Sequence, residues 1–241
     1  MYVGVDGCPD GWLAVVYSDS GYEATHFYRS VTALWAAHND AARILIDVPI
    51  GLREDSSEPR ACDAAARAAL APDRHASVFP TPVRAAARED SYEAAKAVQE
   101  RLTDGSLNRQ TWGIIPKIDE VDRFLLDTPA ARGTIRESHP EVCFRAFAGA
   151  PTTYSKTGQP KRAFWERVAM LRAVDPDVYD HLSAATSSGL ECDASDDDLL
   201  DAFAVALTAR GDDAGVEPLP PDPETDPRGF PMEIVSRPLG E

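Results

Sequence analysis

The sequence predicts an α/β fold with a mixed sheet, and three stretches of the chain support this prediction. Residues 2–17 read as a β-hairpin, because two apolar runs flank a short segment rich in glycine, proline and aspartate. Residues 44–46 read Ile-Leu-Ile, a fully apolar segment typical of a strand in the centre of a parallel sheet. Residues 195–210 carry apolar side chains at helical spacing, which predicts a long helix.

The elements between the first two stretches complete the order β-β-β-α-β. Residues 22–28 are rich in aromatic side chains and alternate imperfectly, which favours a third strand. Ser30 is placed to cap a helix over residues 31–39. Because this helix leads into the apolar strand that ends at Asp47, we expect that strand to lie parallel to its neighbours, in the sheet centre.

The later part of the chain is predicted to be mainly helical around one further strand. Residues 132–138 are expected to form that strand, and Pro140 suits the first turn of the helix that follows. Amphipathic patterns predict further helices over residues 161–173, 175–185 and 195–210.

Residues 52–130 differ from the rest because they carry helical patterns with no strand pattern between them. The helical segments are expected near residues 59–70, 91–103 and 118–126. No flexible linker separates this region, so residues 1–210 should form one domain with a helical insertion at about 52–130, packed over one end of the sheet. Residues 211–241 are rich in proline and acids, which predicts a tail that is loosely ordered or wraps the surface.

The charge composition is strongly acidic. Aspartate and glutamate number 40 against 24 lysines and arginines, which gives a net charge of −16, and only four residues are lysine. This pattern is typical of a salt-adapted cytosolic protein, because the Debye length falls to about 3 Å near 1 M salt and weakens self-repulsion. An acidic protein that avoids nucleic acid is the alternative. The composition excludes a basic-groove binder, but it leaves a nucleic-acid substrate open.

Several features favour a cytoplasmic location. No apolar run approaches the 18 residues of a membrane span, and no signal peptide is visible, so no membrane association is expected. The four cysteines are far apart in the sequence and form no Cys-x-x-Cys pair. We therefore expect reduced thiols and not a disulfide framework or a zinc site.

Carboxylates follow two strands and begin the last long helix. Asp6 follows the first strand, Asp47 follows the apolar central strand, and Asp198 and Asp201 share one face of the helix. Asp6 could simply bond turn amides, and the acids at the helix start could serve as caps. Capping explains Asp201 poorly, since it lies a full turn inside an apolar helix and should be half buried.

Clustered carboxylates repel one another unless cations hold them. Two divalent ions about 4 Å apart would do so, and such a pair supports in-line hydrolysis of phosphodiester bonds. Oxygen ligands favour Mg²⁺ or Mn²⁺ over zinc. The sequence therefore predicts Asp6, Asp47, Asp198 and Asp201 as catalytic metal ligands.

Other polar residues are weaker candidates for the same site. Glu137 and Glu141 flank His139 and could add metal ligands while His139 moves protons, or all three could form a capping cluster. Lys117 could contact phosphate, although a surface ion pair is the commoner role. Four arginines of the insertion could line a phosphate-facing rim, although pairing with acids is favoured for each alone: Arg60, Arg67, Arg74 and Arg84.

Several of these stretches together resemble the domain-of-unknown-function family 429, described as predicted nucleases of the ribonuclease H fold. The resemblance spans about residues 2–210 and rests on Gly4-x-Asp6-Gly7, Gly11-Trp12, Ile46-Asp47-Val48-Pro49-Ile50-Gly51-Leu52, Arg60-x-Cys62-Asp63, Arg67, Ser77-Val78-Phe79, Pro116-Lys117-Ile118-Asp119-Glu120-Val121, Glu137-x-His139-Pro140-Glu141 and Asp197-Asp198-x-Leu200-Asp201-Ala202. It implies a ribonuclease H-like mixed sheet with acids on strand one, strand four and the C-terminal helix. The Asp-x-x-Asp of that helix is similar to Holliday-junction resolvases.

Three functions remain open from the sequence. The first is a metal-dependent nuclease acting on nucleic acid or a nucleotide. The second is an actin-like or sugar-kinase-like phosphotransferase, for which the glycine-rich phosphate loop and the second domain copy are lacking. The third is a non-catalytic binding protein that uses the insertion as its interface. The kind of nucleic acid and the oligomeric state are left open.

Overall fold

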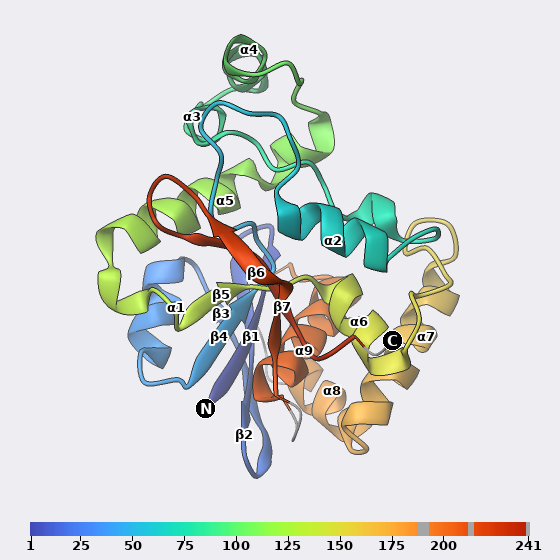
Figure 1. Ribbon diagram of the computed structural model, residues 1–241. Helices are drawn as coiled ribbons and strands as arrows, with labels where there is room; N and C mark the ends of the chain where they lie inside the picture. Colours follow the sequence, from blue (N-terminus) through green and yellow to red (C-terminus); the bar gives the residue numbers. More distant parts are fainter. Residues whose placement is uncertain (188–192, 212–214, 240–241) are drawn as a thin grey trace.

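A five-stranded mixed sheet in the order β3-β2-β1-β4-β5 forms the centre of the computed structural model, which describes residues 1–187, 193–211 and 215–239 (Figure 1). The strands are β1 (Tyr2–Cys8), β2 (Gly11–Ser18), β3 (Gly21–Tyr28), β4 (Arg43–Ile46) and β5 (Ile135–Glu137). The first three form an antiparallel meander, whereas β4 and β5 continue the sheet in parallel with β1. The predicted α/β class and the β-β-β-α-β order are confirmed, and the sheet is consistent with a ribonuclease H-like fold.

Helices cover both faces of this sheet (Figure 1). On one face, α1 (Val31–His38) and α5 (Arg109–Asp127) enclose a core with side chains such as Val5 and Ile46. On the other face, a second core packs around Leu45 and Val15. The helices of that second face are α6 (Pro140–Ala148), α7 (Pro160–Val174), α8 (Val178–Ser187) and α9 (Asp196–Arg210).

The helix α9 lies unusually close to β1 because Gly4 has no side chain. A Cβ atom at Gly4 would lie 1.9 Å from the backbone nitrogen of Ala206 and 2.6 Å from the carbonyl oxygen of Ala202. Side chains two residues apart on a strand share a face, so Gly4 and Asp6 both face α9. The close approach therefore brings the start of α9 to the carboxyl end of β1.

The insertion after β4 is helical, as predicted. Its helices are α2 (Ala61–Ala69), α3 (Arg84–Ala87), α4 (Tyr92–Leu102) and α5, with a short 3₁₀ helix at His75–Ser77. The helix α5 begins well before the predicted residue 118, since Asn108 caps it by accepting a hydrogen bond from the Thr111 amide and Pro116 lies inside it. A proline in a helix interior is normally a break signal, which hides this start in the sequence.

Of the two alternatives for the tail, loosely ordered or wrapped over the surface, the first does not hold for residues 217–236. Residues 217–236 contain β6 (Glu217–Thr225) and β7 (Pro231–Ser236), which pair antiparallel and cross the front of the molecule (Figure 1). The prolines lie mainly in β6, which pairs only with β7, while Met232, Ile234 and Val235 of β7 are buried. Proline is compatible with edge strands, so proline content alone did not exclude a hairpin here.

Two further expectations concern membranes and cysteines. Within the described part of the chain, no helix is both long enough and apolar enough to cross a membrane. Cys62 and Cys143 are buried thiols, and no disulfide occurs among the described residues. Cys192 lies outside the described residues.

The contact between Gly4 and α9 gives a stability prediction. Gly4→Ala should lower the free energy of unfolding by about 3 kcal/mol or more, because the added methyl group meets helix backbone, which cannot rotate away. Gly113→Ala is the matched control, since nothing lies within 4 Å of a Cβ atom at this exposed position of α5. It should raise stability by about 0.5–1 kcal/mol through helix propensity. Urea melts of the three proteins test this, and equal effects of the two substitutions would contradict the close packing.

Candidate metal centre at the ends of β1 and β4

Asp6 and Asp47 lie side by side because of the parallel register of their strands. Val5 pairs with Ile46, and the Asp47 amide donates a hydrogen bond of 2.9 Å to the Val5 carbonyl oxygen. Both acids are on the face that α9 covers, close enough for their carboxylates to influence each other. Two neighbouring carboxylates repel each other when both are ionised.

Asp201 of α9 is the third acid of the cluster. It lies more than one turn inside the helix, and its Oδ2 atom accepts a hydrogen bond from the Lys156 ammonium group. Its other oxygen, Oδ1, is buried and has no hydrogen-bond partner among the described residues. A buried carboxylate oxygen without a hydrogen-bond partner costs free energy of folding. Such oxygens are a common feature of sites that bind an ion or another ligand.

The surroundings of the three acids oppose their ionisation. Burial is the largest cause, and the pKa of Asp6 lies well above its ordinary value because Asp47, Asp201 and Asp198 add repulsion. Burial also raises the pKa of Asp47, although His139 and Lys156 act in the opposite direction. For Asp201, burial raises the pKa to about 6 in spite of the ion pair with Lys156. A bound cation would favour the ionised form of all three acids and so lower their pKa values.

Lys156 is the functional residue that sequence reasoning missed. It lies between α6 and α7, contacts Asp201 directly, and lowers the pKa values of Asp6 and Asp47 by its charge. No local motif marks Lys156. Lysine is scarce in this chain, and this scarcity, which applies equally to Lys117 and Lys156, was the one sequence signal that could have indicated Lys156. The Lys156 ammonium group thus places one positive charge beside Asp201, within the acid cluster.

Asp198 lies near the cluster but serves mainly as a cap of α9. Its Oδ2 atom accepts a hydrogen bond of 2.8 Å from the Ser195 amide, and its own amide donates to the Ser195 hydroxyl group. This reciprocal pair is a capping box. Its charge still raises the pKa of Asp6, so Asp198 is an outer member of the acid cluster.

Glu137 does not join the cluster, which corrects its predicted role as a metal ligand. It pairs with Ile46, whose side chain faces the opposite side of the sheet from Asp47. There its oxygens accept hydrogen bonds of 2.8 Å and 2.7 Å from the buried guanidinium of Arg60. The single-residue offset from Asp47 in the strand register explains the error, because neighbouring strand positions face opposite ways.

Arg60 also contacts the set of potential metal-ligand atoms that lie closest together. Cys62, Asp63 and Glu137 offer atoms within 4.8 Å of one another, the only such set among the described residues. However, Arg60 donates two hydrogen bonds to Asp63 and two to Glu137, so its guanidinium already provides the positive charge. Although burial opposes it, these two acids raise the pKa of Arg60. Asp63 and Glu137 of this set therefore form structural ion pairs with Arg60.

Glu141 and His139 lie at the edge of the site and have other bonds. Arg167, Thr152 and Arg74 donate to the Glu141 carboxylate. Burial alone would raise the pKa of Glu141, but these donors lower it to about 2. The Nδ1 atom of His139 accepts from the Glu141 amide, which leaves the proton on Nε2, 3.4 Å from the Ser77 carbonyl oxygen. Glu141 is thus a partner of arginines and not a vacant metal ligand.

Lys117 lies on the other side of the β1–β2 hairpin. Its ammonium group donates to the Gly11 carbonyl oxygen and lies 4.5 Å from the centre of the Trp12 ring. Burial lowers its pKa, and Glu120, Cys8 and Asp6 partly offset that effect. These contacts hold the hairpin against α5, so the structure gives Lys117 an anchoring position and not a place in the cavity.

A cavity of about 390 Å³ opens next to the acid cluster. The insertion forms one wall, so it leans over the acids as the sequence predicted. Its lining residues are Asp47, Asp73, Arg74, Ala76, Ser77, Phe79, Gln110, His139, Pro140, Glu141, Ser155, Lys156, Thr157 and Asp201. The cavity therefore combines carboxylates, three cationic or protonatable groups, hydroxyl groups and one aromatic ring.

The raised pKa of Asp201 gives a pH prediction for the metal-free protein. An acid whose pKa is about 6 when folded and near 3.8 when unfolded destabilises the fold above those values, so stability should increase as the pH falls through 6. Between about pH 7.5 and pH 5, this group should add about 1 kcal/mol. Asp201→Asn should lose that increment.

The control for this prediction is Asp196→Asn, an exposed acid in the first turn of the same helix. It should retain the pH dependence of the wild type. Urea melts in EDTA at both pH values measure the difference. Parallel pH profiles for wild type and Asp201→Asn would contradict the assigned environment of Asp201.

A comparison with models of protein families places this chain in a family. The family model described as "Protein of unknown function (DUF429)" matches residues 4–225, which include both acid-bearing strands, the insertion and α9. Searches of curated proteins and of solved structures gave no significant match. The resemblance noted from the sequence motifs is thus confirmed at the level of the family. The chain belongs to the DUF429 family.

Proposed function

We propose that this protein is a metal-dependent nuclease or a closely related phosphodiesterase. The proposal rests on the convergence of Asp6, Asp47 and Asp201 in one buried cluster whose negative charge is partly balanced by Lys156. Asp201 also has a buried oxygen without a hydrogen-bond partner among the described residues. The negative charge of such a cluster is not fully balanced by the protein, which is typical of a site that binds a divalent cation.

The residues fit Mg²⁺ or Mn²⁺ better than softer metals. The three acids offer only carboxylate oxygens, and the nearest thiol, Cys143, bonds with the hydroxyl group of Ser138. Asp6, Asp47 and Asp201 would hold the ion, with Asp198 at the outer edge. When bound, the ion would supply Lewis-acid activation and a water of lowered pKa.

The chain itself supplies groups for substrate binding and charge balance. Arg74, oriented by its hydrogen bond of 3.1 Å to Glu141, lines the cavity and can bind phosphate oxygens. His139, whose Nδ1 atom accepts from the Glu141 amide, can donate a hydrogen bond from Nε2 to a phosphate oxygen. Lys156 balances the acids in the metal-free state and can move to the substrate phosphate when a cation replaces it.

The cavity favours an unpaired nucleotide over a rigid duplex. Its volume of about 390 Å³ lies in the range of small-ligand pockets. Phe79 offers a ring on which a base can stack, and Gln110 offers an amide that can hydrogen-bond to a base edge. The substrate class that fits is therefore a nucleotide, or a single-stranded stretch of nucleic acid. The same proposal places the protein in a salt-rich cytoplasm, where its acidic surface is tolerated.

Metal-dependent stability is the first test of this proposal. In high KCl with EDTA, Asp201→Asn should melt at or slightly above the wild-type temperature, because it removes a carboxylate that resists ionisation. Addition of Mn²⁺ should raise the wild-type melting temperature through binding to the folded state and should raise that of Asp201→Asn much less. Asp196→Asn, an exposed acid on the same helix, should respond to Mn²⁺ as the wild type does.

Activity is measured on the same three proteins. Fluorescent single-stranded, duplex and branched oligonucleotides and a dinucleotide are incubated with Mn²⁺ or Mg²⁺. Cleavage by the wild type and by Asp196→Asn, with a loss of at least about 100-fold in Asp201→Asn, is expected from removal of a metal ligand. Metal binding without cleavage of any substrate would favour the binding-protein alternative. Absence of any metal response would refute the proposed centre.

A further inference from the structure

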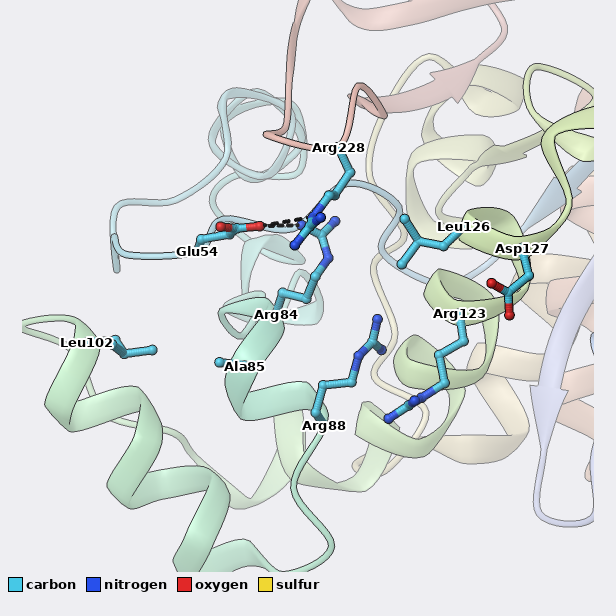
Figure 2. Close-up of a pocket in the computed structure, with 9 residues that line it drawn as sticks. All are labelled: Glu54, Arg84, Ala85, Arg88, Leu102, Arg123, Leu126, Asp127 and Arg228. Atoms are coloured by element: carbon cyan, nitrogen blue, oxygen red, sulfur yellow. Dashed lines mark hydrogen bonds and ion pairs between the residues drawn. The ribbon is translucent and has the colours of Figure 1, made fainter.

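A second, larger cavity lies on another side of the insertion. It has a volume of about 670 Å³, and its walls come from α3, the end of α4, the C-terminal half of α5, the loop after β4 and the β6–β7 turn (Figure 2). Its lining residues are Glu54, Arg84, Ala85, Arg88, Leu102, Arg123, Leu126, Asp127 and Arg228. None of the predicted metal ligands lines it, so it is separate from the acid cluster, although Arg84 was one of the arginines predicted for a phosphate-facing rim.

Four arginines surround this cavity in a protein of net charge −16. Figure 2 shows them as two groups, with Arg84 and Arg228 beside Glu54, and Arg88 and Arg123 between α3 and α5. Glu54 and Asp127 are the two acids of the lining. The lining itself therefore carries four cationic and two acidic side chains. Guanidinium groups repel one another, so this gathering needs a compensating interaction.

Acids beneath the cavity hold the arginines in place; Asp122 and Asp226 are buried, and Asp119 is partly exposed. Asp122 accepts from Arg84 at 3.1 Å and also from Arg88, and Asp119 accepts from Arg123 at 2.8 Å. Asp226 accepts from Arg84 and from the backbone amides that form the β6–β7 turn. The guanidinium groups are therefore positioned before any ligand arrives, which lowers the entropic cost of binding.

The two outer arginines keep donors available for a ligand. The side chain of Arg123 is 57% exposed and contacts Asp119 through Nε, and that of Arg228 is 55% exposed and contacts Glu54 through Nε. In both ion pairs the arginine donates through Nε, so neither pair uses the terminal nitrogens of the guanidinium group. A planar pair of such nitrogens matches the oxygens of a phosphate or carboxylate group.

We propose that this cavity binds a small organic molecule with at least two anionic groups, such as a diphosphate. Arg228, with Arg84 behind it, takes one group, and Arg123, with Arg88 behind it, takes the other. Ala85, Leu102 and Leu126 contact the uncharged remainder. A small ligand fits better than a long polyanion, because Asp127 and the acidic surface outside the cavity repel an extended chain of phosphates. The proposal does not depend on the nuclease activity of the acid cluster.

Pyrophosphate is the probe that tests this site, at fixed ionic strength and in EDTA, so that no cation can bridge it to the acid cluster. Isothermal titration should show one site on the wild type and affinity at least about tenfold lower in Arg123→Gln and in Arg228→Gln. Arg109→Gln, 73% exposed on the same helix α5 and outside the cavity, is the matched control and should bind as the wild type does. Asp201→Asn should also bind normally.

Two further ligands decide how the site is used. Orthophosphate should bind at least about tenfold more weakly than pyrophosphate, since it engages one pair of arginines. A single-stranded oligonucleotide that binds more tightly than pyrophosphate, with loss in the same variants, would overturn the small-molecule assignment. Equal weakening in Arg109→Gln and Arg123→Gln, or no binding of pyrophosphate at millimolar concentration, would refute the site itself.

Discussion

The approach of α9 to β1 over Gly4 is the constraint on which the candidate site depends. A side chain at this position would meet the helix backbone at 1.9 Å, so the helix could not lie where it does. Because Asp6 follows Gly4 on the same face, the contact that packs the core also brings Asp201 towards Asp6. The parallel register of β1 and β4 then adds Asp47. Backbone packing thus assembles the three acids from distant parts of the chain.

The acid cluster differs from the other buried acids in how its charge is balanced. Glu137 and Asp63 meet Arg60, Glu141 meets Arg167, and Asp122 and Asp226 meet Arg84, each through direct ion pairs. These pairs use the abundant arginines and give each acid a direct cationic partner. By contrast, Asp6, Asp47 and Asp201 share one lysine.

This contrast has a physical consequence for function. Truncating one partner of a buried arginine pair leaves an isolated charge, so such pairs act mainly in folding. A lysine on a flexible stem is more easily displaced than a guanidinium held by several hydrogen bonds. The acid cluster is therefore the part of the molecule where an external cation can enter without disrupting the fold.

The sequence predicted the β-β-β-α-β core well because apolar runs, turn residues and helix caps are local signals. It also placed Asp47 directly after the central strand and Asp201 more than one turn inside the last helix, as the structure has them, whereas Asp6 lies within β1, which continues to Cys8. Glu137 was misassigned because a one-residue change in strand position reverses the face, and strand ends are hard to locate from sequence. Lys156 was missed because it lies between α6 and α7, and no local pattern shows where that segment folds. The buried β7 was hidden by the prolines of its partner strand.

The central claim is that Asp6, Asp47 and Asp201 form a cation site that Lys156 balances in the metal-free protein. Anomalous X-ray diffraction from crystals soaked in Mn²⁺ tests it most directly. The account predicts an anomalous peak in contact with these carboxylates and a Lys156 side chain that has moved away from Asp201. A structure in which Lys156 still bonds Asp201, with Mn²⁺ only at exposed acids, would contradict it.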